Sequence, residues 1–269
     1  MFRHAQKKAP RPIDVGTILC LFATAGFAQG QWKVTRSEHE TSPNESVEHW
    51  TTEVENGETA TRATLHCAVF EARAVNLRII DQPDPPRRGL AEVMAQSNGL
   101  GGVNGGYFDP ADAPLGLRVS EGRVLSPFRK AKLLTGVLTA GAARVDIVRA
   151  PRFSMSDKIK SARQCGPLLV ENAGPVAGLN DTRPARRTFA AVDGKGHAAL
   201  GISSAVSLAQ LGQILTLSNV AGKMKIVRAL NLDGGSSSAF WFAGKEGAFS
   251  IEEQKTVRDF VAIVPRSDR

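Results

Sequence analysis

The stretch "RALNLDGGSSSAFWF", residues 228–242, places two strand-like runs on either side of a glycine pair and three serines. Asp-Gly is among the commonest hairpin-turn dipeptides, because glycine tolerates the positive φ that such turns need. By itself the segment predicts a turn between two strands. An acid held rigidly at the end of an apolar strand, with hydroxyl groups beside it, also suits an active site. The rest of the chain has to separate these two interpretations.

Outward from this stretch, short runs of alternating apolar and polar residues recur between glycine turns, as in "TRATLHCAVFEA" (61–72) and "VNLRIID" (75–81). Helical spacing is restricted to 90–99 and to the segment after Ser207, where Gln210 completes a capping box. Strands thus outnumber helices. This pattern predicts an α+β fold, a strand-rich mixed sheet with a few packed helices, in a single domain over residues 61–265.

The chain begins with the layout of a secretory signal peptide over residues 1–28. A basic leader precedes the apolar run "VGTILCLFATAGFA" (15–28), which is short for a bilayer span, and cleavage is expected after Ala28. We therefore expect a secreted or periplasmic protein without stable membrane insertion. Residues 29–60 are polar and irregular, and they predict one or two edge strands at most.

Charge and cysteine content narrow the function classes. The net charge of +8 favours anionic partners, but the basic residues are dispersed, so nucleic acid is not an expected partner. Cys67 and Cys165 follow the leader, either as a disulfide or as two buried thiols. Neither a CxxC pair nor a zinc-like histidine spacing is present, and we expect no metal and no cofactor. The oligomeric state is left open.

Three further stretches share the glycine-rich character of the first, namely "NGGYFD" (104–109), "CGPLL" (165–169) and "RRTFAAVDG" (186–194). Each alone predicts a turn. Together they supply a strand-borne arginine and doubled glycines, whose unshielded N–H groups an anionic oxygen can approach. An acid, an arginine suited to bidentate phosphate contact and bare backbone donors favour hydrolysis of a phosphorylated substrate.

The order of these motifs resembles the phosphodiester glycosidase family, which includes the enzyme that uncovers mannose 6-phosphate by removing N-acetylglucosamine. Its members show Asn-Gly-Gly-aromatic-Phe, then Gly-Pro-x-Leu, then Pro-Arg-Thr, and finally a helix followed by Asn-Leu-Asp-Gly-Gly-Gly-Ser. This chain has "NGGYF", "GPLL", "RRT" and "NLDGGSS" in that order, with the helix "SLAQLGQIL" before the last. The match covers about residues 61–265.

The resemblance implies a hydrolase that cleaves a sugar C1–O bond to a phosphodiester in an envelope or extracellular glycan. Phosphate is a good leaving group and needs little help from a general acid. Such an enzyme therefore depends less on a second carboxylate than the glycosidases that use a pair of carboxylates. The implied catalytic residues are Asp233 as base or electrostatic stabiliser, Arg187 on the phosphate, and Asn104. The implied substrate-binding residues are Gly105, Gly106, Tyr107, Thr188, Gly234, Gly235 and Ser236, with the backbone N–H groups near Gly105 and Gly234 on the phosphate.

Two positions depart from the family pattern. Ser236 stands where the family usually has a third glycine, which shortens the bare backbone. Residues 201–204, "GISS", replace an Asp-Gly-Arg that often follows the second strand of the Arg-Thr hairpin. Without this arginine, the substrate and the activity can differ from those of other family members.

Two other functions are compatible with the same residues. One is a divalent-metal phosphodiesterase in which Asp233 and Asp109 hold the ion, although Asp109 precedes Pro110 in a turn-like context and is better explained as a turn residue. The other is a non-catalytic envelope protein that binds a phosphoglycan. In each case the expected partner is an anionic, phosphorylated glycan.

Overall fold

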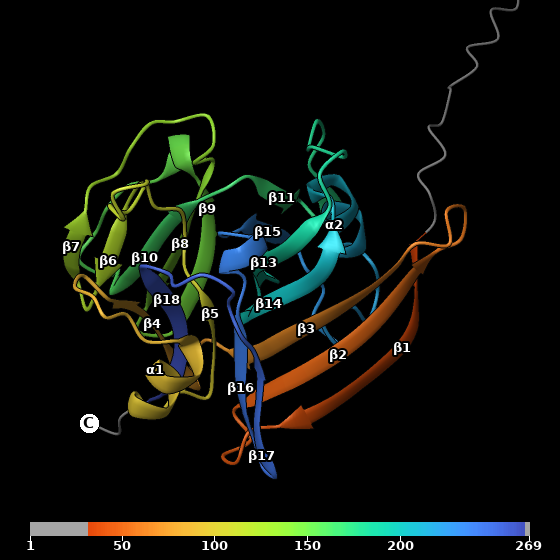
Figure 1. Cartoon of the computed structure of the whole chain (residues 1–269), viewed down its shortest axis with the longest axis horizontal. Helices are drawn as coiled ribbons and strands as arrows, with labels where there is room; N and C mark the ends of the chain where they lie inside the picture. Colours follow the sequence, from red (N-terminus) through yellow and green to blue (C-terminus); the bar gives the residue numbers. More distant parts are fainter. Residues whose placement is uncertain (1–31, 267–269) are drawn as a thin grey trace, which may run out of the picture.

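The computed structural model describes residues 32–266, which fold into three packed antiparallel sheets with two short α-helices (Figure 1). The predicted strand-rich α+β single domain is confirmed, with antiparallel sheets in place of the expected mixed one. The eight-stranded sheet contains, in spatial order, β1 (Trp32–Thr41), β2 (Val47–Asn56), β3 (Arg62–Glu71), β14 (His197–Val206), β13 (Ala185–Val192), β15 (Arg228–Asn231), β11 (Leu168–Glu171) and β12 (Gly174–Pro175).

Two five-stranded sheets pack against it. The first contains β7 (Arg123–Ser126), β6 (Arg118–Ser120), β10 (Ser161–Cys165), β8 (Gly136–Gly141) and β9 (Arg144–Arg149). The second contains β17 (Gly247–Ile251), β16 (Phe240–Gly244), β5 (Gly101–Asn104), β18 (Asp259–Pro265) and β4 (Val75–Asp81). The helical elements are α1 (Leu90–Gln96), α2 (Leu208–Ile214) and the 3₁₀ turns Ala150–Arg152 and Gly235–Ser237.

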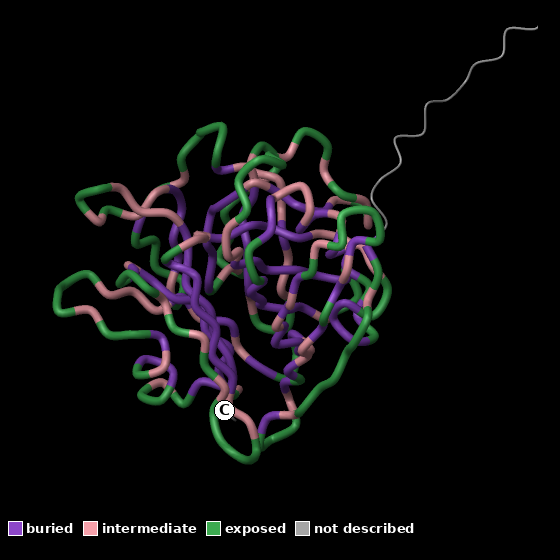
Figure 2. Tube along the Cα trace, turned by 45° about the vertical axis from the view of Figure 1, so that its right-hand side comes forward, coloured by how far each residue is buried: buried purple, intermediate pink, exposed green. Residues whose placement is uncertain are grey.

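The core lies where the sheets face one another, and Figure 2 shows the buried segments there, with exposed residues in the connecting loops. All three sheets contribute to the largest apolar cluster, for example through Leu200, Leu138 and Val261. A second cluster fills the other face of the eight-stranded sheet, where Leu211 and Ile214 of α2 pack on Phe189 and its neighbours. Alternating side chains thus give the large sheet two buried faces.

Several local predictions are confirmed. Ser207 Oγ accepts the Gln210 N–H at 3.0 Å, and Gln210 Oε1 accepts the Ser207 N–H at 2.9 Å, which is the capping box of α2. The expected Glu121-Gly122 turn joins β6 to β7, with φ values of 51° and 81°. Among residues 32–266, no helix is long and apolar enough to cross a membrane.

The segment expected to be irregular contains β1 and β2, each ten residues long. Strand β1 lies at the sheet edge, but β2 pairs with both β1 and β3, so only one of the two is an edge strand. The predicted signal peptide lies outside the described residues. Cys67 and Cys165 are free, buried thiols in different core clusters, which resolves the open choice against a disulfide.

Candidate functional site

Asp233 lies just beyond the end of β15, where the chain turns toward Gly235–Ser237. Its backbone is fixed from β5, far away in sequence. The Asp233 N–H donates to the carbonyl of Gly105 at 3.0 Å, and Asn104 Nδ2 donates to the carbonyl of Asp233 at 2.8 Å. Two of the glycine motifs therefore meet at this acid, as the sequence predicted, and the carboxylate has a rigid base.

Asn104 is fully buried, and its side chain is committed to the protein. Its Oδ1 accepts the hydroxyl of Thr188 at 2.7 Å and the N–H of Ala239 at 3.0 Å. Thr188 is equally buried. Neither side chain has an atom left for substrate in this arrangement. In this arrangement Asn104 supports the backbone of Asp233, and Thr188 supports Asn104. The catalytic role of Asn104 and the substrate contact of Thr188 stay predictions.

The carboxylate of Asp233 is mostly buried, and this desolvation raises its pKa above the usual value of 3.8. The hydroxyl of Ser237, the N–H of Gly234 at 2.9 Å and the buried guanidinium of Arg163 act in the opposite direction. The desolvation effect is the largest of these. A carboxyl group with a raised pKa is suited to accepting a proton during a reaction near neutral pH.

Arg187 lies at the start of β13, close to the Asp233 turn. Its Nε donates to the carbonyl of Val206 at 3.1 Å, and its Nη2 donates to the carbonyl of Arg183. Its Nη1 is the guanidinium nitrogen nearest Gly234, 3.8 Å from where a Cβ would stand on that glycine. Within the described chain no ion pair joins Arg187 to Asp233, so this cation and this acid converge without neutralising each other.

Tyr107 is the third side chain of this group, and its ring packs on the main core. Its hydroxyl donates to the carbonyl of Gly166 at 2.6 Å and accepts from Asn231 Nδ2 at 3.0 Å. Burial raises the pKa of Tyr107, so the phenol stays protonated. Asn231 Oδ1 is buried without a protein partner within the described residues. Asn231 belongs to the stretch 228–242, but the sequence did not indicate a role for it. Its partners Tyr107 and Gly166 are distant in the chain, and no local pattern shows them.

The glycine pair 105–106 does not offer free donors. The N–H of Gly105 donates to the carbonyl of Asp259 at 2.7 Å, and the N–H of Gly106 donates to its Oδ1 at 3.1 Å. The N–H of Gly234 is likewise used by the carboxylate of Asp233. In this arrangement a backbone carbonyl accepts from Gly105, and carboxylates accept from Gly106 and Gly234, so a phosphate contact at these amides would have to replace those bonds.

The glycines at 105 and 106 instead make room for a buried ion cluster. An added Cβ on Gly105 would lie 1.5 Å from Asp259 Oδ1, and one on Gly106 would lie 2.6 Å from the guanidinium carbon of Arg163. Arg163 and Arg118 both pair with Asp259, at 3.3 and 3.2 Å. Sequence reasoning missed this cluster. The one signal in the sequence was a charged residue in or at the start of each predicted strand, and that signal does not show which charges form pairs.

Free backbone donors occur at the two residues that follow Gly234. Within residues 32–266, the N–H groups of Gly235 and Ser236 have no protein acceptor. Gly235 has a φ of +66°, and an added Cβ there would meet nothing within 4 Å. Both residues face open space beside Asp233, and their contact with substrate stays a prediction. The bare backbone is thus displaced from the first glycine of the motif to its second.

Comparison with known proteins supports the order of these motifs. The profile of the phosphodiester glycosidase family matches residues 97–264, more than half of the 269-residue chain. The chain belongs to this family. The match spans the glycine motifs, both arginines of β13 and the Asp233 turn.

Relatives of the chain are distant from it. The uncharacterized protein YigE of Escherichia coli K12 is 33% identical over 90 residues, which are 31% of this chain and 35% of YigE. The catalytic domain of zebrafish N-acetylglucosamine-1-phosphodiester α-N-acetylglucosaminidase, auto-inhibited by its pro-peptide, has a TM-score of 0.62 at 14% identity, covering 86% of this chain and 88% of that one.

Two further solved structures share the fold. A hypothetical protein from Synechocystis has a TM-score of 0.62 at 15% identity, covering 82% of this chain and 62% of the other. A putative exported protein from Burkholderia pseudomallei has a TM-score of 0.53 at 13% identity, covering 78% and 75%. The chain thus spans about a third of YigE and under two thirds of the Synechocystis protein.

The departure from the family pattern at 201–204 lies directly beside Arg187. Ser203 is the residue opposite Arg187 in the pairing of β13 with β14. Its hydroxyl is buried without a protein partner within the described chain. A family member that has the Asp-Gly-Arg sequence here would have a second arginine beside the one at position 187. In this chain Arg187 is the strand-borne cation on which an anion at this point would depend.

Asp109, the second candidate carboxylate, closes a turn. Its Oδ1 accepts the N–H groups of Ala111 and Ala113, each at 2.9 Å. This use of the carboxylate agrees with the turn interpretation. Within residues 32–266, no group of three or more His, Cys, Asp or Glu side chains could hold a metal ion.

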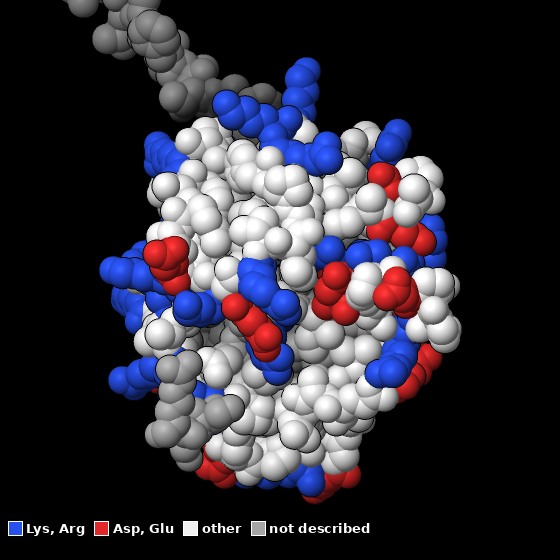
Figure 3. All heavy atoms as spheres, turned by 90° about the vertical axis from the view of Figure 1, so that its left-hand side faces the viewer, with Lys and Arg blue, Asp and Glu red and all other residues white. Residues whose placement is uncertain are grey.

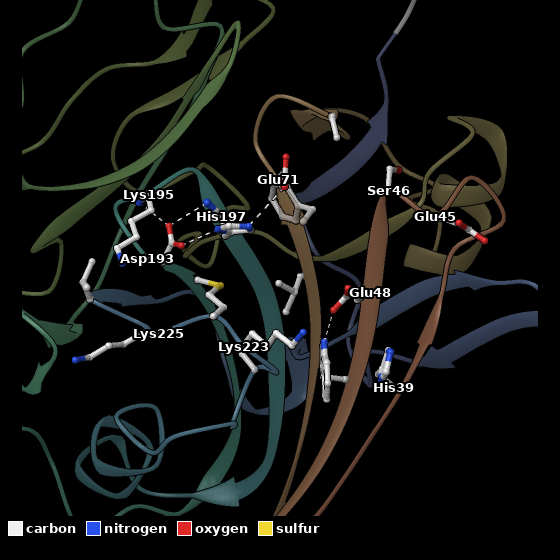
Figure 4. Close-up of a pocket in the computed structure, with 17 residues that line it drawn as sticks. His39, Glu45, Ser46, Glu48, Glu71, Asp193, Lys195, His197, Lys223 and Lys225 are labelled. Atoms are coloured by element: carbon white, nitrogen blue, oxygen red, sulfur yellow. Dashed lines mark hydrogen bonds and ion pairs between the residues drawn. The ribbon is translucent and has the colours of Figure 1, made fainter.

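A cavity of about 750 Å³ lies away from this family site, at the other end of β13 (Figure 4). Its labelled side chains include Asp193, whose carboxylate contacts His197 Nδ1 at 2.7 Å, and Lys195, Lys223 and Lys225 around the rim. Asp193 also accepts two backbone N–H groups of its own hairpin turn. This Asp–His pair is therefore explained by closure of the β13–β14 turn.

Proposed function

We propose that this member of the phosphodiester glycosidase family is a hydrolase that cleaves a sugar C1–O bond to a phosphodiester. The observation that supports this most is the convergence at Asp233. Its carboxylate has a raised pKa, its backbone is clamped by β5, and Arg187 stands nearby without pairing with it. The zebrafish structural neighbour is named for the same kind of bond.

In the proposed reaction a water molecule attacks C1 of the sugar, and Asp233 accepts a proton from that water. The C1–O bond to the phosphodiester breaks, and its electron pair leaves with the phosphate oxygen. Arg187 and the N–H groups of Gly235 and Ser236 stabilise the departing anion. The products are a free sugar and a phosphate monoester. Tyr107 and Asn231 hold the wall of the site beside Gly166.

The substrate is proposed to be a phosphorylated glycan of the cell envelope or extracellular matrix. The basic leader and apolar run at residues 1–28 support export, and one structural neighbour is described as an exported protein. Cell fractionation with detection of the processed chain tests the location. Retention of the uncleaved chain in the cytoplasm would contradict it.

Replacement of Asp233 by Asn tests the chemistry. We expect turnover of a panel of sugar-1-phosphate diesters and UDP-sugars to fall about a hundred- to ten-thousand-fold, the range for loss of a general base. The matched control is Asp109→Asn, which removes a turn carboxylate and should leave turnover near that of the parent protein. Undiminished turnover in Asp233→Asn would exclude the proposed role of Asp233.

The same panel separates the two other functions. A phosphoglycan-binding protein would retain the ligand without releasing any product, in the parent protein as well as in the variant. A metal phosphodiesterase would lose its activity on exhaustive chelation and release the sugar phosphate rather than the free sugar. Product identification is therefore the decisive measurement.

A further inference from the structure

Exposed apolar side chains are concentrated in one part of the molecule. Within residues 32–266, the exposed large hydrophobic residues are Val124, Leu125, Leu133 and Met155, between 39 and 54% accessible. Single exposed apolar residues are ordinary on a protein surface. Here all four fall in the segments 122–135 and 150–160, which we call the basic-apolar surface.

The same two segments carry a strong positive charge. They contain seven exposed Lys and Arg residues, among them Arg129, Lys130, Lys132 and Lys158, and a single acid, Asp157. None of the seven forms an ion pair within the described chain. Figure 3 faces this side of the molecule and shows several Lys and Arg groups along its top edge, with an acidic group beside them at the upper right.

Contacts between the two segments make the surface continuous. The Gly122 N–H donates to the carbonyl of Lys160 at 2.8 Å, and the rings of Phe128 and Phe153 stack with centroids 5.7 Å apart. The buried Gln164 anchors the first segment, because it bonds both the N–H and the carbonyl of Arg129. The apolar and basic side chains are therefore held on an ordered support.

We propose that the basic-apolar surface docks the protein on an anionic lipid bilayer. Lysine and arginine are attracted to the negative surface potential, while leucine, valine and methionine side chains enter the boundary between headgroups and acyl chains. Positive charge and apolar anchors together satisfy the two-signal requirement for stable peripheral binding. A soluble anion would use the cations but would leave the four exposed apolar residues without a role.

The basic-apolar surface is connected to the wall of the proposed active site through the backbone of Leu133. The carbonyl of Leu133 lies against Gly166, since a Cβ on Gly166 would stand 2.2 Å from it. Gly166 in turn accepts the hydroxyl of Tyr107. Leu133 is therefore joined through Gly166 to Tyr107 of the proposed site, and a docked protein would meet glycans near the bilayer surface. The docking itself does not depend on the proposed hydrolysis.

Vesicle sedimentation tests the docking directly. The protein is purified as the host cell processes it, and its N-terminal residue is determined. It is then mixed with vesicles of phosphatidylcholine plus phosphatidylglycerol, and with vesicles of phosphatidylcholine alone. We expect binding to the anionic vesicles that weakens as salt is added. The double variant Lys130→Gln/Lys132→Gln should bind about 30-fold less, about fivefold for each lysine.

Two further variants define the mode of binding. Leu133→Ser/Met155→Ser should weaken binding without changing its dependence on salt. The matched control Lys223→Gln/Lys225→Gln removes two exposed lysines from the rim of the 750 Å³ cavity and should leave binding unchanged. Thermal unfolding of each variant verifies that the fold is intact, as expected for exposed positions.

Three results would overturn the proposal. They are equal binding to neutral vesicles, equal loss of binding in the Lys223/Lys225 control, and absence of vesicle binding combined with retention of inorganic phosphate by Lys130 and Lys132. Light scattering measures whether two copies of the chain associate through the basic-apolar surface. Self-association that the Leu133/Met155 variant abolishes, without vesicle binding, would assign the surface to a dimer instead.

Discussion

At the scale of single residues, the position of Asp233 depends on a buried neighbour, Asn104. Asn104 uses its amide group to join β5 to three other parts of the chain: Asp233 after β15, Thr188 in β13 and Ala239 before β16. Its burial leaves no water to replace these partners. A change at Asn104 would therefore affect stability as well as any activity.

Replacement of Asn104 by Ala should lower the free energy of unfolding by about 2–4 kcal/mol, because three buried polar groups lose their partner. Chemical denaturation measures this loss. The matched variant Thr188→Val removes one donor and keeps the bond from Ala239, so a loss of about 1 kcal/mol is expected. Equal and small losses in both variants would show that Asn104 does not clamp the strands.

The surroundings of Asp233 also predict how activity depends on pH. Desolvation raises the pKa of Asp233 above 3.8, and a base has to be deprotonated to accept a proton. Activity should therefore be present above this raised pKa and decline as the pH falls through it. The profile of kcat/KM against pH should show this acid limb above pH 3.8. A flat profile down to that pH would contradict a role for Asp233 as the base.

At the scale of elements, the end of β5 depends on glycine because a carboxylate occupies the space of a side chain. Asp259 of β18 accepts the N–H groups of both Gly105 and Gly106, and pairs with two buried arginines. Removal of one partner from such a buried cluster leaves an uncompensated charge, which costs more than the pair contributes.

The variant Gly105→Ala should destabilise the protein by more than about 3 kcal/mol, because its Cβ would overlap Asp259 and displace it from the arginines. Gly174→Ala is the matched control, since its Cβ would lie 3.8 Å from the nearest atom and its φ is not positive. That change should alter stability by about 0.5–1 kcal/mol. Urea denaturation of the two variants makes the comparison.

At the scale of the whole molecule, the β16–β17 hairpin packs against β2 and β3 through aromatic rings. His49 and His66 lie in this contact, with His49 Nε2 3.1 Å from His66 Nδ1 and both rings close to Phe249. Burial lowers the pKa of both histidines, that of His66 to about 4. Two neutral imidazoles therefore join the two sheets.

Stability should fall in mild acid for this reason. The folded pKa of His66 lies below its unfolded value of 6.5, so the unfolded chain binds the proton first. This contribution is complete above pH 6.5 and is lost as the pH falls toward about 4. Solvent screening limits it to roughly 1–2 kcal/mol. Thermal unfolding across this range should show the decline, and His66→Asn should flatten it.

The sequence by itself determined the local elements and the order of the motifs. Alternation and turn dipeptides predicted the strands and hairpins, and the Ser207–Gln210 spacing predicted α2, since these signals depend on residues close together in the chain. The same local signals located Asp233 at the end of a strand. They gave only a weak indication of β1 and β2, which form because β2 pairs with β3 and β1 pairs in turn with β2.

Only the tertiary structure decided which polar atoms remain free for a substrate. Residues 104 and 233 are 129 positions apart, yet their hydrogen bond makes Asn104 a support for the Asp233 backbone. The amides of Gly105 and Gly106 are likewise consumed by Asp259, which no local pattern announces. Hydrogen bonds and ion pairs act over a few ångströms of space, and a linear sequence does not record which distant residues share that space.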